Sequence, residues 1–162
     1  MAGYGDDVGF NAWLSDNGYE LTSDAPTVAV LRQRGSTYID ATYAARFVGR
    51  PTGGVAQERQ WPRTDASTLW TDIGPDVIPA AVVEASYQAA WYEANNSGGL
   101  VAGGSAASGV KREKVGSIEV EYQASSSSDS FAASLTPLIS TVDGLLAPYL
   151  RGAYSCPAIL VV

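Results

Sequence analysis

The 162-residue sequence contains no histidine. A chain without histidine cannot build the Ser-His-Asp or Cys-His arrangements of nucleophilic catalysis, and it cannot bind zinc through imidazole. It has a single cysteine, Cys156, which can form neither an internal disulfide nor a thiolate metal site. We therefore expect no enzymatic activity, no cofactor and no bound metal, and we interpret Cys156 as unreactive or buried at a contact.

Positive charge is also scarce in this chain. It has 10 Lys and Arg against 17 Asp and Glu, which gives a formal net charge of −7 and a pI near 4.4. Sequence-independent affinity for nucleic acid comes mainly from basic side chains that displace counterions from phosphates. We therefore expect single-stranded DNA to bind weakly or not at all near physiological salt, unless the fold gathers the few basic residues on one surface.

Long hydrophobic runs are missing as well, because no stretch reaches the roughly 18 apolar residues of a membrane-spanning helix. The first residues lead directly to Asp6 and Asp7 and lack the basic start and apolar core of a secretory signal. We expect a protein that contacts no membrane and is intracellular when synthesised. Its length fits one domain with one core.

Four segments of the sequence have helical periodicity. Phe10, Trp13 and Leu14, for example, recur at the spacing of one helix face. Pro148 should end or kink the last of the four segments. The predicted helices cover residues 7–17, 26–45, 79–95 and about 136–148.

Small residues mark where two of these helices can approach closely. Gly35 lies on the apolar stripe of the second predicted helix, which it weakens by up to about 1 kcal/mol relative to alanine. The third predicted helix carries a small-residue face that includes Ala85, Ser86 and Ala89. We expect these positions to permit close packing of another element.

Residues 46–78 are predicted to form a long connection, because glycine and proline interrupt any helical or strand periodicity in this stretch. Connections of this length in a compact domain are usually functional or partly disordered. The apolar residues Trp61, Leu69 and Trp70 predict that this one is fixed to the core at intervals. We interpret Trp61-Pro62-Arg63 as a loop anchor.

The best strand signal lies between two Gly/Ser-rich stretches, residues 96–109 and 123–130. Residues 110–115 and 118–122 flank Gly116-Ser117, a dipeptide that fits a two-residue type II′ turn. The register that this turn sets places Arg112 opposite Glu121 and Lys114 opposite Glu119. Each such pair contributes roughly 0.2–1 kcal/mol across an antiparallel ladder.

This hairpin carries the only run of closely spaced basic residues in the sequence, Lys111, Arg112 and Lys114. Beside aromatic residues such as Trp61 and Trp91, a basic cluster can indicate single-strand binding by stacking and phosphate contacts. In the predicted register, however, the neighbouring glutamates cancel most of its field. We interpret the hairpin as a solvated or subunit-contacting arm. Its candidate interface residues are Lys111, Arg112, Lys114, Glu119 and Glu121.

The sequence after Gly152 has no helical period and contains a run of aliphatic residues. Such side chains favour association when they are exposed on a free monomer. We predict that residues 151–162 form an extended docking tail. Its candidate interface residues are Arg151, Tyr154, Ile159, Leu160, Val161 and Val162.

Together these patterns predict a mainly α protein, with a small bundle of about four helices, one β-hairpin arm and an extended C-terminal tail. Residues 1–150, with the hairpin at 110–122, form the helical domain in this prediction. Residues 151–162 form the tail.

Several short motifs follow one another along the chain. They are Tyr38-Ile39-Asp40, Arg46-Phe47, Gly49-Arg50, Trp61-Pro62-Arg63, Ile78-Pro79, the hairpin with its Lys-Val-Gly turn, and residues 145–150. In this order they resemble a family of small tailed-phage proteins, and the resemblance spans about residues 26–150. Members of the family are often described as DnaT-like single-stranded DNA-binding proteins, and their gene position and helix order are similar to those of head–tail connector (adaptor) proteins.

The resemblance implies a structural role in a virion, at the head–tail junction, after assembly in the host cytoplasm. The implied form is a ring of about twelve copies under the portal protein, with a stopper or tail-terminator protein below. Such a ring links the capsid vertex to the tail and lets double-stranded DNA pass without specific binding. The net charge of −7 fits a lumen that must not hold phosphate.

Two alternatives to the connector stay open. A single-stranded DNA-binding replication protein is one, although such a protein is expected to be basic. A small acid hydrolase is the other. It would use a pair of carboxylates such as Asp6 and Asp7, but no neighbouring residues in the sequence mark such a pair as an active site.

The connector interpretation makes two predictions about assembly. Changing Arg112 and Lys114 to Glu should weaken assembly more than it weakens the helical core. Deleting residues 153–162 should leave a folded protein that no longer joins the portal.

Overall fold

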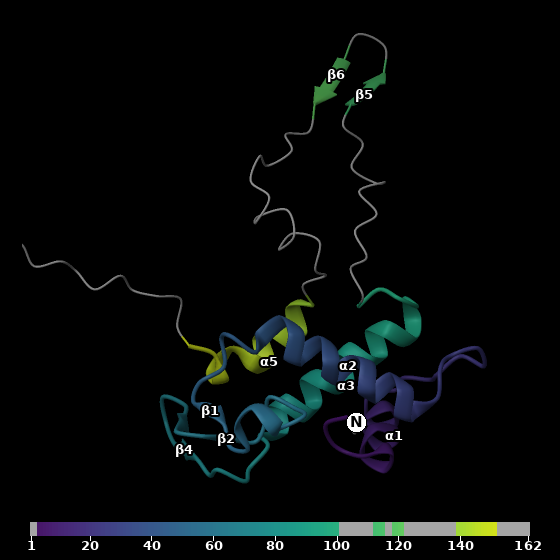
Figure 1. Ribbon diagram of the computed structural model, residues 1–162. Helices are drawn as coiled ribbons and strands as arrows, with labels where there is room; N and C mark the ends of the chain where they lie inside the picture. The colour runs from purple at the N-terminus through teal and green to yellow at the C-terminus, as the bar shows by residue number, and fades with distance from the viewer. Residues whose placement is uncertain (1–2, 101–111, 116–117, 122–138, 152–162) are drawn as a thin grey trace, which may run out of the picture.

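The structure is a computed structural model that describes residues 3–100, 112–115, 118–121 and 139–151 (Figure 1). Helices dominate these residues, so the predicted mainly α fold with four helices is confirmed. The helices are α1 (Asp7–Asp16), α2 (Val28–Tyr43), α3 (Ala80–Asn95) and α5 (Ser140–Leu146), with 3-10 turns η1 (Gly54–Ala56) and η3 (Ala147–Tyr149).

The strands of the described residues are short and form two-stranded antiparallel ladders. The pairs are β1 (Arg50–Pro51) with β2 (Arg63–Thr64), β3 (Ala66–Ser67) with β4 (Asp72–Ile73), and β5 (Arg112–Val115) with β6 (Ile118–Glu121). The β5–β6 register matches the sequence prediction, with Arg112 opposite Glu121 and Lys114 opposite Glu119. The first two ladders lie in the connection that the sequence predicted to be irregular. They were not predicted, because strands of two residues are too short to show an alternating pattern.

Close contact between α2 and α3 organises the helical core. A Cβ atom on Gly35 would lie 2.3 Å from the backbone oxygen of Ser86, a distance that no side chain tolerates. Ala85, Ser86 and Ala89 of α3 are completely buried. The predicted close approach of these two helices is therefore confirmed, and it requires glycine at position 35.

Two apolar clusters occupy opposite ends of the α2–α3 pair. Figure 1 shows α1 near one end and α5, with the β1–β4 region, at the other. The first cluster joins α1 to the pair through Phe10, Leu14, Leu31, Tyr87 and Ala90. The second includes Tyr38, Ile39, Tyr43, Phe47, Trp61, Val82, Val142 and Leu146.

Several helix boundaries differ from the sequence prediction by one or two residues: α1 ends at Asp16 and α2 at Tyr43, before the predicted residues 17 and 45. Helix α2 begins at Val28, because Thr27 has an extended backbone with ψ 150°, and Pro26 therefore lies outside the helix. Pro79 directly precedes α3 as its N-cap residue and does not occupy the first helical position. The predicted effect of Pro148 is confirmed, because α5 ends at Leu146 and Pro148 lies in η3. The predicted beginning of that helix, at residue 136, lies outside the described residues.

The connecting segment, residues 44–79, is fixed to the core through Trp61. Its ring is 1% exposed and lies edge-on to Phe47 and Tyr149, with centroids 5.7 and 6.1 Å away. The backbone N–H of Trp61 donates to the Tyr4 hydroxyl at 3.2 Å, and the bond to Pro62 is cis. The interpretation of this motif as a loop anchor is confirmed. The same prediction for Leu69 and Trp70 is wrong, because both side chains are largely exposed.

Candidate nucleic-acid interface

The interface residues predicted from the sequence fall in three different parts of the chain. Arg112, Lys114, Glu119 and Glu121 lie in the β5–β6 ladder, where each basic residue faces a glutamate in the register. Arg151 follows η3 and is exposed. The other predicted interface residues, Lys111, Tyr154, Ile159, Leu160, Val161 and Val162, lie outside the described residues.

The structure also brings together arginines that lie far apart in the sequence. The backbone N–H of Arg151 donates to the carbonyl oxygen of Arg46 at 2.7 Å, and that of Val48 donates to Tyr149 at 3.0 Å. These bonds form an antiparallel bridge with Phe47 opposite Leu150. Arg46 therefore lies beside Arg151, where the chain leaves both α2 and η3.

Arg63 holds the same stretch of backbone from the core side. Its Nε donates to the carbonyl oxygen of Val48 at 2.7 Å, and its Nη2 donates to that of Gly49 at 2.9 Å. Nη2 of Arg151 donates to the same Gly49 oxygen at 3.2 Å. Two guanidinium groups thus share one carbonyl oxygen, one of them buried and the other exposed.

These two guanidinium groups repel each other. Burial lowers the pKa of Arg63, and the positive charge of Arg151 lowers it further. A carbonyl oxygen carries only a partial negative charge, so it compensates two cations incompletely. An anion such as a phosphate placed beside them would reduce this repulsion.

Arg46 and Arg50 come three residues before and one residue after Gly49 in the sequence, and both are exposed to solvent. The Arg46 guanidinium lies over the Tyr43 ring, 5.7 Å from its centroid. Arg50 forms an ion pair with Asp65 at 3.2 Å, and both side chains are largely exposed. Exposed pairs of this kind contribute little to stability, so Arg50 can exchange this partner for another anion. We call Arg46, Arg50 and Arg151 the arginine surface.

The other arginines of residues 3–100, apart from Arg63, form ion pairs with carboxylates within the fold. Arg32 pairs with Asp7, Arg34 with the buried Glu93, and Arg59 with Asp40. The Glu93 carboxylate also accepts hydrogen bonds from the backbone N–H groups of Gly98 and Leu100. These three arginines stabilise the protein, and they leave the arginine surface as the described site best suited to an anionic ligand.

The sequence contained only part of the signal for the arginine surface. Arg46 and Arg50 are four residues apart, which is a spacing that reasoning from the sequence could have noted. Arg151, by contrast, reaches them only through the Phe47–Leu150 bridge, and no local pattern predicts a single pair of bridged residues. The hairpin was predicted as a candidate interface because its basic residues lie close together in the sequence.

The tryptophans that accompany basic residues in the sequence differ in their access to a ligand. Trp61 is buried and cannot stack on a base. Trp91 is half-buried and already stacks on Tyr19, with centroids 4.6 Å apart and planes 7° from parallel. Trp70, at the turn between β3 and β4, is 89% exposed. Of the three, Trp70 is the one with a free aromatic face.

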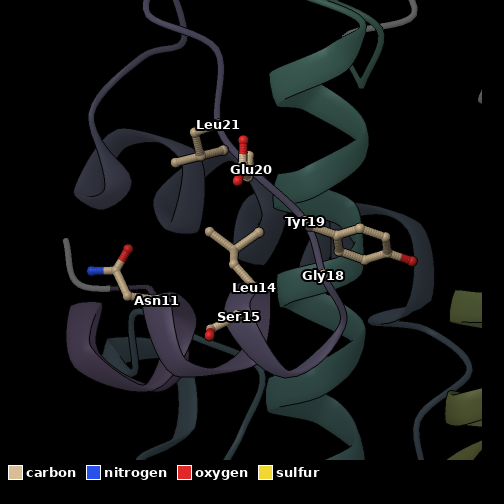
Figure 2. Close-up of a pocket in the computed structure, with 7 residues that line it drawn as sticks. All are labelled: Asn11, Leu14, Ser15, Gly18, Tyr19, Glu20 and Leu21. Atoms are coloured by element: carbon tan, nitrogen blue, oxygen red, sulfur yellow. The ribbon is translucent and has the colours of Figure 1, made fainter.

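Two hollows in the described residues have different characters. Figure 2 shows one of about 560 Å³ between the end of α1 and residues 18–21, where the Tyr19 ring points away from the hollow. Its one charged lining residue is Glu20. The other, of about 550 Å³, lies between β4 and η3, and we call it the Trp70 groove. Its walls include Trp70, Ile73, Val77, Pro148 and Tyr149.

In the described part of the chain, no three acidic or cysteine side chains are placed to hold one metal ion. None of the helices described is both long enough and apolar enough to cross a bilayer.

The fold and the site define a small, mainly α-helical protein with short antiparallel hairpins and one arginine-rich end. A family model matches residues 4–161, and the chain belongs to that family, the DnaT-like ssDNA binding proteins. Searches of curated proteins and of solved structures find no match to the chain. The family match agrees with one part of the resemblance seen in the sequence, and it provides no support for the head–tail connector.

Proposed function

We propose that this protein binds single-stranded nucleic acid and that the arginine surface contacts the phosphates. The observation that carries the proposal is that the exposed Arg46 and Arg151 are neighbours across the Phe47–Leu150 bridge, and that Arg50 follows the Gly49 carbonyl to which Arg151 donates, in an otherwise acidic protein. The family's description, which names single-stranded DNA binding, supports the same function. The order of preference drawn from the sequence alone, with the connector first, is thereby reversed.

The charge of the chain limits how tight such binding can be. Three arginines neutralise about three phosphates, whereas the net charge of −7 repels the rest of the strand. Base stacking on an exposed aromatic side chain adds affinity without sequence preference, and Trp70 offers such a side chain. We therefore expect weak, sequence-tolerant binding, with a dissociation constant on the order of 10⁻⁴–10⁻⁶ M near physiological salt.

A titration of a fluorescently labelled oligothymidine, followed by anisotropy, tests this proposal. The double variant Arg46→Ala, Arg151→Ala should bind at least roughly tenfold more weakly, because it removes two of about three phosphate contacts. Both side chains are exposed, so we expect the variant to keep its fold, which circular dichroism checks.

The matched control is the double variant Asn11→Asp, Gln33→Glu. It lowers the net charge by the same two units at exposed positions of α1 and α2, away from the arginine surface. It should keep most of the wild-type affinity. If both double variants lose affinity equally, overall charge and not the arginine surface controls binding, and the proposal is wrong.

The head–tail connector remains the second candidate, and the net charge of −7 is the observation that favours it. A ring through which DNA slides should present little positive charge to phosphate. The β5–β6 register, which sets each basic residue opposite a glutamate, also suits a contact between subunits. Negative-stain images of the purified protein, alone and mixed with a portal protein, test this candidate: rings or portal complexes support it, and single chains with neither count against it.

A further inference from the structure

The Trp70 groove is an apolar surface without a partner in the described residues. Its wall residue Trp70 and the adjacent Leu69 are 89% and 93% exposed, and Val77 is half exposed. Asp72 is the one charged residue among those lining the groove. Contiguous exposed apolar surface of this kind usually marks a binding site, and its volume of about 550 Å³ lies within the usual range for ligand sites.

The groove also offers an open strand edge. Strand β4 (Asp72–Ile73) lies in its wall and, among the described strands, pairs with β3 alone. An extended peptide can add its backbone to such an edge while its alternate side chains enter the neighbouring hollow. The groove therefore fits an extended, uncharged and aliphatic segment.

The chain itself contains a segment of this chemistry. Eleven residues follow Arg151, and they include the uncharged run Ala-Ile-Leu-Val-Val at 158–162. β-Branched residues in this run favour an extended conformation. No other segment of the chain contains as many consecutive aliphatic residues outside the described helices.

The path of the chain at Arg151 favours the groove of a second copy over its own. The antiparallel bridge carries the backbone from Tyr149, beside Val48, to Arg151, beside Arg46. The groove lies the other way: the chain continues from Val48 through β1 to Thr52, whose Oγ1 donates to the carbonyl oxygen of Pro75, next to the groove residues Gly74 and Val77. The chain therefore leaves its body while running away from its own groove.

We propose that residues 158–162 of one copy occupy the Trp70 groove of a second copy of this chain. The contact is head-to-tail, because the groove and the tail are different surfaces of each protomer, and such contacts build rings or open chains. The groove contact does not use the arginine surface, but it covers Trp70, so a docked tail and a base stacked on Trp70 would compete for that side chain.

Complementation between two single variants tests this proposal. Val77→Asp places a charge in the groove and leaves the tail intact, and Leu160→Asp places a charge in the tail and leaves the groove intact. We expect the wild type to show a mass that rises with concentration above the 16.9 kDa of one chain, measured by analytical ultracentrifugation. For each variant alone, the dissociation constant of self-association should rise by at least about tenfold.

The mixture of the two variants gives the decisive result. An intact tail and an intact groove are then present on different chains, so we expect a heterodimer of about twice the mass of one chain. Wild type that stays at the mass of one chain, or a mixture that does not associate, overturns the proposal. The second result would indicate that the tail folds back on its own groove or binds elsewhere.

Two controls separate the groove from general effects of charge and folding. Val8→Asp makes the same substitution at an exposed valine of α1, and it should associate like the wild type. The tail variant should keep the far-ultraviolet circular dichroism spectrum of the wild type at a concentration where both are single chains, which shows that its loss of association is not a loss of fold. If Val77→Asp does not fold, Trp70→Ala replaces it in the mixture, because Trp70 is mostly exposed.

Discussion

The α2–α3 pair and the connecting segment are both ordered parts of this protein, but different forces hold them. The helix pair is held by close packing of small side chains, with Gly35 against the backbone at Ser86. The connecting segment has only two-residue ladders, and side chains satisfy much of its backbone: Arg63 donates to the carbonyls of Val48 and Gly49, and Gln57 donates to that of Pro62.

This difference teaches how an irregular segment can stay ordered. Buried backbone groups need hydrogen-bond partners wherever they lie, and helices supply these partners from their own backbone. The connecting segment obtains them from long polar side chains, and arginine is suited to this because it presents several donors in a rigid arrangement. Arg151, which also donates to Gly49, is exposed and so leaves positive charge at the surface.

The largest expected effect comes from breaking the packing of the helix pair. Gly35→Ala should lower the free energy of unfolding by about 3 kcal/mol, because its Cβ meets backbone atoms that cannot move aside. Denaturant unfolding measures the change. Gly144→Ala in α5 is the control, since no atom lies within 4 Å of its new Cβ, and it should raise stability by up to about 1 kcal/mol. Equal effects at the two sites would contradict this account of the α2–α3 contact.

A smaller loss is expected when the connecting segment is released. Arg63→Met keeps much of the side-chain volume and removes the donors to Val48 and Gly49, so it should cost about 2 kcal/mol. Proteolysis within residues 44–79 should then become faster than cleavage of the helices. Arg50→Met should change stability by less than about 0.5 kcal/mol, because Arg50 pairs only at the surface. A globally destabilised Arg63 variant without faster local cleavage would contradict the role given to Arg63.

The next effect concerns alkaline pH and the junction of the two regions at Tyr4. Burial, and then the charge of Asp40, raises the pKa of Tyr4 far above its ordinary value of 10.0; burial and the hydrogen bond to Asp143 raise the pKa of Tyr43. Above about pH 10 the unfolded chain loses these protons and the folded protein keeps them. Stability should therefore fall by about 1.4 kcal/mol per pH unit for each tyrosine.

Denaturant unfolding at about pH 9 and pH 11 measures this loss. Tyr4→Phe removes one of the two groups, so its loss over that interval should be smaller by about 1.4 kcal/mol. Tyrosinate absorbance in the folded protein gives an independent reading. Early ionisation of all nine tyrosines, without unfolding, would contradict the burial of these hydroxyls.

Local patterns predicted the helical part of the fold well. The stripe with Gly35, the small face of α3 and the β5–β6 register each depend on residues close together in sequence, where periodicity and turn chemistry act directly. The starts of α2 and α3 were less accurate, because proline fits both the first turn of a helix and the residues just before it. Neither of those errors changes the architecture.

The candidate site was much harder to predict from the sequence. It depends on one antiparallel bridge between Phe47 and Leu150, and on a buried arginine whose partners are backbone carbonyls. Backbone carbonyls are present at every residue, so the sequence does not show which ones a side chain will bind. Exposure of Trp70 and burial of Trp61 likewise follow from tertiary packing and not from residue type.

The salt dependence of single-stranded DNA binding tests the central claim most directly. If Arg46, Arg50 and Arg151 each neutralise about one phosphate, the logarithm of the binding constant should fall with the logarithm of salt concentration at a slope of about −2. Arg46→Ala, Arg151→Ala should reduce the slope to about −0.7, and Asn11→Asp, Gln33→Glu should leave it near −2. No binding at about 50 mM salt, or a slope that the arginine variant does not change, would contradict the account.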